Sequence, residues 1–332
     1  MYPFDVNLIK GLNLKRIVNL LKVTISYWRH SLLIDFGISG LPPVLSIEPT
    51  NLCNLHCLQC PSGKGELKRD RGMMDISLFK KIIDTTKNHL IYLLLYFQGE
   101  PMLNRNIISM IEYVRRFKIY VVISTNGHYI KTDNDAKNLI NSGLNGIIFS
   151  IDGATEESYK VYRAGGNFNT VLDGIRRLIE TKQKMKSKSP KVYLQFIVMK
   201  HNQSEIEQIK RLGKSLNVDK VFLKSVQIYD ENDYTNLLPS MEKFRRYNKI
   251  NGSLVLKKET KNHCRRVLFS SVVTWDGKVL PCCFDKDARF SLGRIDNSYS
   301  FNDIWNSKKS VEFRKKVFTE RESIFICRNC IE

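Results

Sequence analysis

The sequence predicts an α/β fold built around a mostly parallel, barrel-like sheet. Between residues 44 and 225, short β-branched or apolar runs alternate with longer helical patterns. Such alternation indicates βαβ units, whose strands lie parallel. An open doubly wound sheet is the alternative, but no Gly-x-Gly-x-x-Gly segment follows the first strand, which weakens a dinucleotide-binding assignment. We therefore expect a barrel-like sheet with its functional loops at the carboxyl ends of the strands.

Six strands and five intervening helices are expected in this region. The strands are predicted at Val44–Glu48, Ile91–Phe97, Ile119–Ser124, Gly146–Ile151, Val192–Met199 and Val221–Leu223. The helices are predicted at Ile76–Asn88, Ile107–Phe117, Asp135–Ser142, Val171–Lys186 and Ser204–Ser215, where apolar residues recur at helical spacing. Together with a short approach to the first strand, these elements define a core over residues 41–225.

Three further segments flank this core. Residues 1–40 form an amphipathic helical segment, for which we favour packing onto the core over a peripheral membrane contact. Residues 226–262 are a polar connector with a helix expected around Met241–Lys249. Residues 263–332 begin with a hairpin of Ser270–Thr274 and Val279–Leu280 around an Asp-Gly turn, and a helix around Phe301–Phe318 follows.

Composition excludes the disordered and fibrous classes. Of 332 residues, 42% are hydrophobic and 26% are charged, which is ordinary globular usage. The longest stretch without Asp, Glu, Lys or Arg has 14 residues, Asn138–Ile151, whereas a membrane helix needs roughly 18–20. No export signal is visible in Met1–Lys10. We expect a cytoplasmic protein whose eight cysteines bind metal or do chemistry rather than form disulfides.

The net charge of +20 attracts anions. Nucleic acid, an anionic membrane and a phosphorylated substrate all satisfy such a charge. However, the basic residues are spread along the chain, and no zinc-finger spacing or RNA-recognition motif accompanies them. No nucleic acid partner is expected, and the charge mildly favours an anionic substrate.

Three cysteines lie in one short loop directly after the first predicted strand. Cys53, Cys57 and Cys60 stand in the sequence Cys-Asn-Leu-His-Cys-Leu-Gln-Cys. Three thiolates bind one metal centre from one side and leave a position open for another ligand, which is typical of a catalytic site. Thiolates bind zinc or iron–sulfur clusters, and a four-iron cube needs four ligands, of which this loop supplies three.

Four more cysteines lie in the tail: Cys264, Cys282, Cys327 and Cys330. Four thiolates make a closed site of the structural type, suited to zinc or to a fully ligated iron–sulfur cluster. Spacing alone leaves these two alternatives open.

The cysteine loop and several strand ends together resemble the radical S-adenosylmethionine (SAM) enzymes. The Cys-x3-Cys-x2-Cys loop is that family's signature, and the Gln98–Pro101 segment resembles its Gly-Glu-Pro motif. Ser124–Gly127 and Ser150–Gly153 end the next two strands, and Tyr162-Arg163 stands where related enzymes place a SAM-contacting arginine. The tail resembles the SPASM/twitch type of auxiliary-cluster extension, in the short form with four cysteines rather than seven.

The resemblance implies a partial (β/α)6 barrel, two [4Fe–4S] clusters and bound SAM. Cys53, Cys57 and Cys60 would hold the SAM-binding cluster, and the four tail cysteines would hold the auxiliary cluster. The SAM contacts implied are Gly99, Glu100, Pro101, Ser124, Asn126, Ser150, Asp152 and Arg163, with Gln195 and Asn202 as weaker candidates. In this scheme Glu100 accepts a hydrogen bond from the methionine amino group, and Arg163 pairs with the carboxylate. A flavodoxin- or ferredoxin-type protein would be the electron donor.

One cysteine, Cys283, remains outside both sets. A buried free thiol is the plain interpretation. The alternative is catalytic: a thiol facing a substrate radical donates a hydrogen atom and makes the enzyme an epimerase.

The reaction implied is hydrogen abstraction from a substrate carbon by a 5′-deoxyadenosyl radical. We favour oxidation of a small polar or carbohydrate-like substrate, with the auxiliary cluster accepting the second electron, because the tail spacing is similar to that of an aminocyclitol dehydrogenase. The alternatives are modification of a ribosomal peptide and epimerisation of a sugar. A non-enzymatic zinc or nucleic-acid-binding protein is the competing class, but it gives no role to the strand-end motifs.

Overall fold

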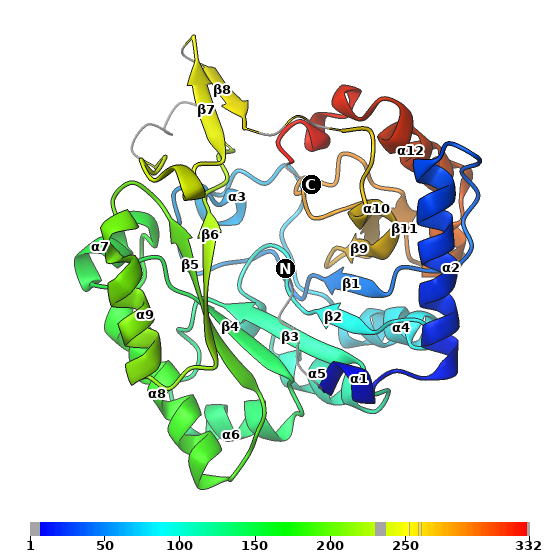
Figure 1. Cartoon of the computed structure of the whole chain (residues 1–332). Coiled ribbons are helices and arrows are strands. Elements are labelled where there is room, and N and C mark those ends of the chain that lie inside the picture. The colour runs from blue at the N-terminus through cyan, green and yellow to red at the C-terminus, as the bar shows by residue number, and fades with distance from the viewer. Residues whose placement is uncertain (1–6, 230–236, 252, 258, 260, 331–332) are drawn as a thin grey trace. The chain divides into compact units, whose positions relative to one another are not determined.

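The computed structural model describes residues 7–229, 237–251, 253–257, 259 and 261–330 (Figure 1). The chain divides into two compact units. The first comprises Met1–Leu52, Leu67–Val121 and Lys258–Glu332, and the second comprises Cys53–Glu66 and Val122–Lys257. Within the described residues, no helix is long and apolar enough to cross a membrane.

The strands of the first unit are contributed by the two ends of the sequence. They are β1 (Val44–Ile47), β2 (Tyr92–Leu94), β9 (Ser270–Val273), β10 (Lys278–Leu280) and β11 (Gly293–Arg294), in the order β11-β10-β9-β1-β2. β1 pairs in parallel with both β2 and β9, and β9 and β10 form the expected antiparallel hairpin. The tail is therefore built onto the first strand of the core rather than folded apart from it.

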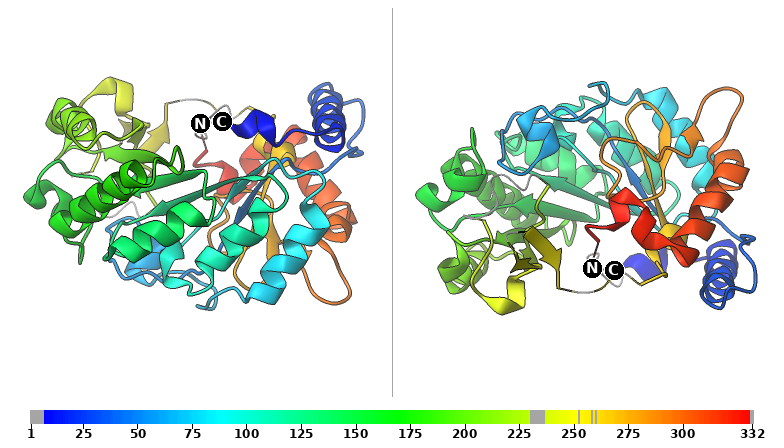
Figure 2. Two further views of the ribbon diagram at one scale, coloured as in Figure 1. Left: turned by 90° about the horizontal axis from the view of Figure 1, so that it is seen from below. Right: turned by 90° about the horizontal axis from the view of Figure 1, so that it is seen from above.

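All three chain segments of the first unit contribute helices. They are α1 (Asn7–Lys10), α2 (Leu14–Ser31), α4 (Ile76–Thr86), α5 (Ile107–Arg115), α10 (Arg266–Phe269), α11 (Phe301–Trp305) and α12 (Lys308–Thr319). α4 begins at Asp75, whose carboxylate accepts the Ser77 amide hydrogen bond, and buries Phe79, Ile82 and Ile83. α4 and α5 lie side by side (Figure 2).

The second unit contains the remaining parallel strands. β3 (Tyr120–Thr125) enters it from the first unit and is followed by β4 (Gly146–Ser150), β5 (Lys191–Val198) and β6 (Lys220–Ser225). Their order is β3-β4-β5-β6, and each neighbouring pair is parallel. Its helices are α3 (Pro61–Lys64), α6 (Asp133–Asn141), α7 (Glu156–Tyr162), α8 (Phe168–Lys184) and α9 (Ile206–Ser215), with α6 and α8 side by side (Figure 2). The predicted α/β class with a mostly parallel sheet is confirmed.

Several elements differ from the sequence prediction. The helix expected around Met241–Lys249 is wrong, because β7 (Tyr247–Ile250) pairs antiparallel with β8 (Ser253–Leu256). The signal was the Asn-Gly dipeptide after Ile250, since Asn251 has the positive φ of 49° that such hairpin turns require. The helix expected around Phe301–Phe318 is two helices, because Ser307 caps a new one. α7 was not expected.

α2 joins the first unit through polar contacts. The Arg16 guanidinium, 2% exposed, donates hydrogen bonds to the carbonyl oxygens of Lys87 (3.0 Å), Phe117 (2.7 Å) and Lys118 (3.2 Å), and it also reaches Gly11. Further along the helix, the Asn19 side chain bonds the backbone of Leu41, and Ser26 bonds that of Ser39. The expected packing of this segment onto the core is thus present, but a largely polar face makes it.

We expect the buried His89, which lies near Arg16, to make the free energy of unfolding depend on pH. Burial, and then the Arg16 charge, lower the pKa of His89 from 6.5 to about 4. Between these values the unfolded chain binds a proton that the folded chain does not, so stability falls as the pH drops below 6.5. His89 should therefore account for about 2 kcal/mol of the stability lost between pH 7 and pH 5.

Denaturant unfolding at the two pH values checks this prediction. His89→Gln should reduce the difference between the two free energies of unfolding by that amount. His263→Gln, at an exposed histidine of the same unit, should leave the difference unchanged. An equal pH dependence in wild type and His89→Gln would contradict it.

Candidate functional site

The three-cysteine loop is fixed by backbone hydrogen bonds within the second unit. The amide of His56 donates to the carbonyl of Ala164 at 2.8 Å, and that of Leu58 donates to Tyr162 at 3.3 Å. The loop therefore lies against the end of α7, which carries Arg163 as its C-cap residue. Cys57 is buried together with Leu55 and Tyr162 in one hydrophobic cluster, while Cys53 and Cys60 are half-buried and pack against it.

Arg163 is the charged group nearest to Cys57. Its Nη1 donates to the Cys57 sulfur at 3.7 Å, and its Nε and Nη2 lie 2.7 and 2.5 Å from Oδ2 of Asp152. Burial raises the pKa of the Cys57 thiol, and the positive charge of Arg163 opposes this rise. Arg163 and Asp152, both predicted as SAM contacts, form a buried ion pair beside a loop cysteine.

Asp152 also joins the ends of two strands. Its Oδ1 accepts the amide hydrogen bond of Ile197 at 2.7 Å, and its own carbonyl accepts one from the Asn202 side chain at 2.8 Å. The Asn202 amide oxygen in turn accepts from the Met199 amide. Asn202 therefore fixes the β4 and β5 ends on which Asp152 depends, and the side chain of Asp152 is fully buried.

The strand-end residues before Asp152 are brought to the same loop. The Asn126 amide donates to Oδ1 of Asn54 at 2.8 Å and lies 4.0 Å from the Cys53 sulfur. Ser124 and Ser150 face each other, with their hydroxyl oxygens 3.4 Å apart. Of the sequence-predicted residues of the second unit, Asn126 and Arg163 thus contact the cysteine loop, while Ser124 and Ser150 contact each other.

The Gly-Glu-Pro segment lies in the first unit, after β2. Gly99 has a φ of +74°, and a Cβ there would lie 2.5 Å from the carbonyl oxygen of Leu52, so only glycine fits. The Glu100 amide donates to that same carbonyl at 2.8 Å. The Glu100 carboxylate caps the following 3₁₀ turn by accepting the Met102 amide hydrogen bond, and Pro101 is the first residue of the turn. This segment therefore fixes the backbone that leads into Cys53.

A buried ion pair next to this segment was not anticipated from the sequence. Glu48 and Arg69 form a two-pronged contact, with 2.6 Å between Arg69 Nη1 and Glu48 Oε2. Glu48 also accepts the amide hydrogen bonds of Gln98 and Trp275. Burial raises the pKa of Glu48, and Arg69 opposes that rise. The available signal was an acidic residue ending an otherwise apolar strand. The Trp275 ring packs over Gly72.

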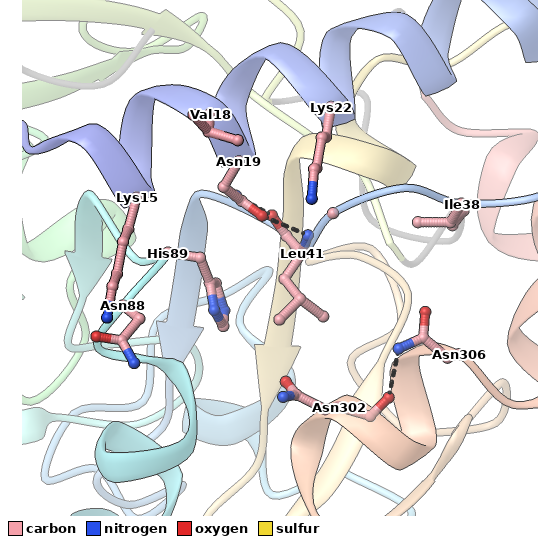
Figure 3. A pocket seen from close by; sticks show the side chains of 11 residues that line it. Lys15, Val18, Asn19, Lys22, Ile38, Leu41, Asn88, His89, Asn302 and Asn306 are labelled. Carbon is pink, nitrogen blue, oxygen red and sulfur yellow. Dashed lines mark hydrogen bonds between the residues drawn. The ribbon is translucent and has the colours of Figure 1, made fainter.

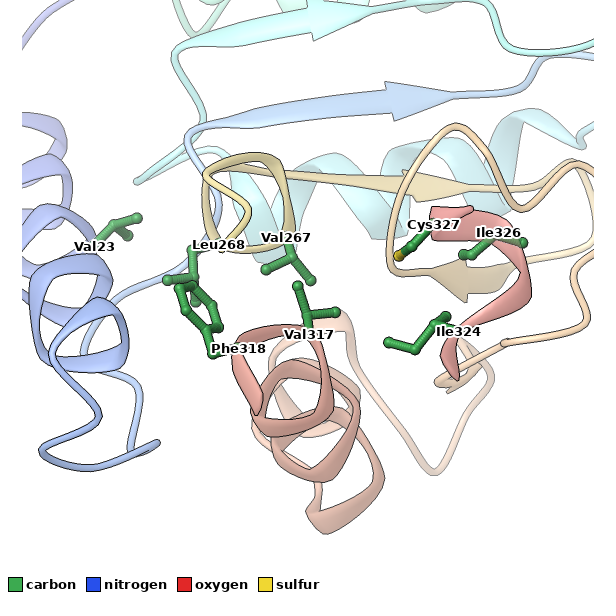
Figure 4. Close-up of a cluster of buried hydrophobic side chains, with 8 residues drawn as sticks. All are labelled: Val23, Val267, Leu268, Val317, Phe318, Ile324, Ile326 and Cys327. Carbon is green, nitrogen blue, oxygen red and sulfur yellow. The ribbon is translucent and has the colours of Figure 1, made fainter. Parts of the chain in front are cut away.

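The tail cysteines gather at one place in the first unit. Cys327 belongs to a hydrophobic cluster with residues of α2, α10 and α12 (Figure 4). Cys264 and Cys282 pack against that cluster. Burial, and then the neighbouring charges of Cys283, Cys264 and Cys327, raise the pKa of Cys282. Arg321 is fully buried, and burial lowers its pKa. The negative charges of the neighbouring Cys264, Cys330 and Cys327 thiolates have the larger, opposite effect, so the pKa of Arg321 lies above its ordinary value.

The remaining thiol has a cationic neighbour. Cys283 is half-buried, and its sulfur accepts a hydrogen bond from Nη1 of Arg266 at 3.1 Å. Within the residues that the structure describes, no three His, Cys, Asp or Glu side chains converge closely enough for a single metal ion.

Comparison with known proteins assigns the family. The family described as the Radical SAM superfamily matches residues 47–213, which is half of the chain. The chain belongs to the radical SAM superfamily. An iron–sulfur cluster-binding domain of the SPASM type matches residues 264–331 of this radical SAM enzyme. Together the two domains imply [4Fe–4S] clusters.

Three curated relatives are similar to this radical SAM enzyme over different lengths. A tungsten-containing aldehyde ferredoxin oxidoreductase cofactor-modifying protein of Pyrococcus furiosus is 25% identical over 81% of this chain and 82% of its own. A GTP 3′,8-cyclase of Alkaliphilus metalliredigens is 26% identical over 55% of this chain and 56% of its own length. The mycofactocin maturase MftC of Mycobacterium tuberculosis is 31% identical over 41% of this chain and 34% of its own length.

Solved structures confirm the fold of this radical SAM enzyme. BtrN in complex with AdoMet and 2-DOIA covers 89% of this chain and 95% of its own, with 20% identity and a TM-score of 0.55. The match to Streptococcus suis SuiB bound to S-adenosylmethionine covers 90% of this chain and 74% of SuiB, with 15% identity and a TM-score of 0.64. Native anSMEcpe with bound AdoMet covers 87% and 88%, with 18% identity and a TM-score of 0.61. The fold is thus the partial barrel of these enzymes with a C-terminal extension.

Proposed function

We propose that this radical SAM enzyme oxidises a small polar or carbohydrate-like substrate with the help of one auxiliary [4Fe–4S] cluster. The observation that carries the proposal is the placement of the four tail cysteines: Cys264 and Cys282 pack against the hydrophobic cluster that contains Cys327, and the Cys330 amide donates to the Cys327 carbonyl at 3.1 Å. One closed set of four thiolates suits one fully ligated cluster. The match to BtrN, whose structure holds AdoMet and 2-DOIA, covers nearly all of both chains.

The donor chemistry of the two cysteine sets suits two iron–sulfur clusters. Cys53, Cys57 and Cys60 are thiols in one loop, and Arg163 supplies a cation at the Cys57 sulfur. A neighbouring cation favours the thiolate form, which is the form that binds iron. Arg321 has the same relation to Cys264, Cys327 and Cys330. We assign the loop set to the SAM-binding cluster and the tail set to the auxiliary cluster.

Cys53, Cys57 and Cys60 would hold the cluster that, with SAM, would supply the hydrogen-abstracting 5′-deoxyadenosyl radical. The tail cysteines would hold the cluster that would accept the second electron, while the hydroxyl proton of the substrate would pass to solvent. The chain's own share is positioning and the exclusion of water. Leu55 and Tyr162 bury the Cys57 side of the loop, and Gly99 permits the close approach that fixes Leu52 before Cys53.

For SAM itself we propose contacts at the predicted residues of each unit. In the second unit these are Ser124, Asn126, Ser150, Asp152 and Arg163, which lie at or just after the ends of β3, β4 and α7. In the first unit they are Gly99, Glu100 and Pro101. Arg163 has two kinds of contact in this scheme: its Nε donates to the carboxylate of the buried Asp152, and its Nη1 is directed toward the Cys57 sulfur.

Transfer of deuterium from substrate carbon tests the proposed reaction. Anaerobic, reconstituted enzyme with SAM and a flavodoxin- or ferredoxin-type reductant is supplied with polyols and aminocyclitols deuterated at the carbinol carbon. We expect deuterium in 5′-deoxyadenosine and a ketone product. Without the tail cysteines, deuterium transfer should persist while the ketone is lost. SAM cleavage without any deuterium transfer from these compounds would contradict the proposed substrate class.

Modification of a peptide or cofactor is the second candidate. The curated relative that covers 81% of this chain is a cofactor-modifying protein, and SuiB has been solved bound to its precursor peptide SuiA. Label transfer from a deuterated peptide rather than from a polyol would favour this alternative.

Replacement of Cys283 distinguishes oxidation of the substrate from epimerisation. In an epimerase, Cys283 would return a hydrogen atom to the substrate radical, and its thiol exchanges with solvent. Under the oxidation that we propose, Cys283→Ala should leave turnover within about twofold, and product formed in D2O should carry no new carbon-bound deuterium. Mass spectrometry of the product measures this. Deuterium incorporation that disappears in Cys283→Ala would establish the epimerase alternative instead.

A further inference from the structure

The exposed face of α2 is apolar, which is the reverse of what a packed helix shows. Its buried residues are Arg16, Asn19, Val23, Ser26 and His30, four of which are polar. In a helix of a globular domain the apolar stripe faces the core and the polar face meets water. Here Asn19 and Ser26 are already satisfied by the backbone at Leu41 and Ser39, so the orientation of α2 is fixed by specific contacts.

The opposite face carries a continuous apolar row, here called the outer stripe. Its six members are Leu14, Val18, Leu21, Ile25, Trp28 and Leu32. They are spaced alternately four and three residues apart, so they align along one side of the helix. Each is between 40% and 76% exposed. Single exposed apolar residues are ordinary, but a contiguous exposed row marks an interaction surface.

Basic residues run along one edge of the outer stripe. Lys15, Lys22 and Arg29 recur every seven residues, and no Asp or Glu lies between residues 7 and 34. Arg29 pairs with Asp35. Lys15 and Lys22 instead point from α2 into a pocket of about 500 Å³, which shares Val18 with the stripe (Figure 3).

The pocket beside the stripe is polar and cationic. Asn88, His89, Asn302 and Asn306 contribute to its lining (Figure 3). In the part of the chain that the structure describes, His89 Nε2 and the Asn302 side-chain oxygen have no hydrogen-bond partner. Leu41, Asn88 and His89 of the pocket come just before the first residues of β1 and β2, whereas the cysteine loop and the Gly-Glu-Pro segment come after the last residues of these strands. The pocket is therefore distinct from the site described above.

Charge decides between the occupants that would cover such a face. A second copy of α2 would bring cations against cations, because the helix offers no acidic partner. An anionic lipid surface satisfies both features, since the apolar row enters the boundary between headgroups and acyl chains while flanking lysines meet phosphates. We propose that the outer stripe of α2 binds the surface of an anionic membrane, with Lys15 and Lys22 contacting lipid phosphates.

Vesicle sedimentation of the complete, cluster-loaded chain tests this proposal. Vesicles of 30% phosphatidylglycerol and 70% phosphatidylcholine should bind the protein, and pure phosphatidylcholine vesicles should bind it at least tenfold more weakly. Leu21→Glu with Ile25→Glu should lower the affinity at least tenfold. The control, Ile250→Glu with Val255→Glu, places the same two charges at exposed apolar positions of the β7–β8 hairpin and should stay within twofold.

Replacement of Lys15 and Lys22 tests the electrostatic part of the proposal independently. Lys15→Gln with Lys22→Gln should weaken binding to the anionic vesicles about tenfold or more, since each cation near an anionic surface contributes about fivefold, and should flatten its salt dependence. Circular dichroism confirms that each variant is folded. The proposal is overturned by failure of the wild type to sediment, by equal binding to both vesicle types, or by equal losses in the stripe and hairpin variants. A concentration-dependent dimer lost in the stripe variant, without vesicle binding, would overturn it in favour of a second copy.

Discussion

Replacing Cys53, Cys57 and Cys60 together by Ala is expected to abolish SAM cleavage and to lower the iron content from about eight to about four per chain, because each cube carries four irons. The loop set and the tail set share no cysteine, so the two clusters should be lost separately. Replacement of Cys264, Cys282, Cys327 and Cys330 should also leave about four irons, but SAM cleavage should persist. Iron and sulfide analysis of anaerobically purified protein, with the release of 5′-deoxyadenosine, measures both quantities.

Cys283→Ala is the matched control for these variants, because it removes a thiol that belongs to neither set. It should keep about eight irons and full SAM cleavage. A colourless protein that holds zinc would contradict the cluster assignment. Equal loss of SAM cleavage in the loop and tail variants would contradict the division of roles between the two sets.

Arg163→Gln is expected to destabilise the chain by about 3–5 kcal/mol, because it leaves the carboxylate of Asp152 buried and unpaired. Arg163 and Asp152 are 13% and 0% exposed at their side chains, so water cannot replace the lost partner. The same change removes the cation at the Cys57 sulfur. A lower affinity for the loop cluster should therefore accompany the loss of stability, visible as a reduced cluster absorbance after reconstitution.

Denaturant unfolding of the cluster-free chain separates these effects. The double variant Arg163→Gln with Asp152→Asn should recover part of the lost stability, since it removes both charges from the interior. Arg176→Gln is the control: its pair with Asp173 is half exposed on both sides, so its loss should cost less than about 1 kcal/mol. Equal effects of Arg163→Gln and Arg176→Gln would show that the buried pair is not important for stability.

Local patterns were sufficient for much of the fold and for the cysteine sets. The six strands lie where β-branched runs occur, because parallel strands buried on both faces need such runs. The hairpin β7–β8 was missed because its strands have only four residues each and mix polar with apolar side chains, and because its Asn-Gly turn was overlooked. α7 was missed because its seven residues are too few to display a helical period.

Pairings between distant residues could not be read from the chain. Asp152 and Arg163 were predicted separately, as SAM contacts. They form one buried ion pair because α7 returns to the end of β4. The same holds for Glu48, Arg69 and Trp275, which lie far apart in sequence and meet in one network.

The sequence by itself determined the radical SAM signature, the two cysteine sets and the alternation of strands and helices, because each depends on spacing within a short segment. The tertiary structure alone decided which face of α2 is buried. Amphipathicity shows that a helix has two unlike faces, but the side that packs is chosen by its partners. Here the carbonyl groups of Lys87, Phe117 and Leu41 need donors, and Arg16 and Asn19 supply them, so the polar face turns inward and the apolar one remains outside.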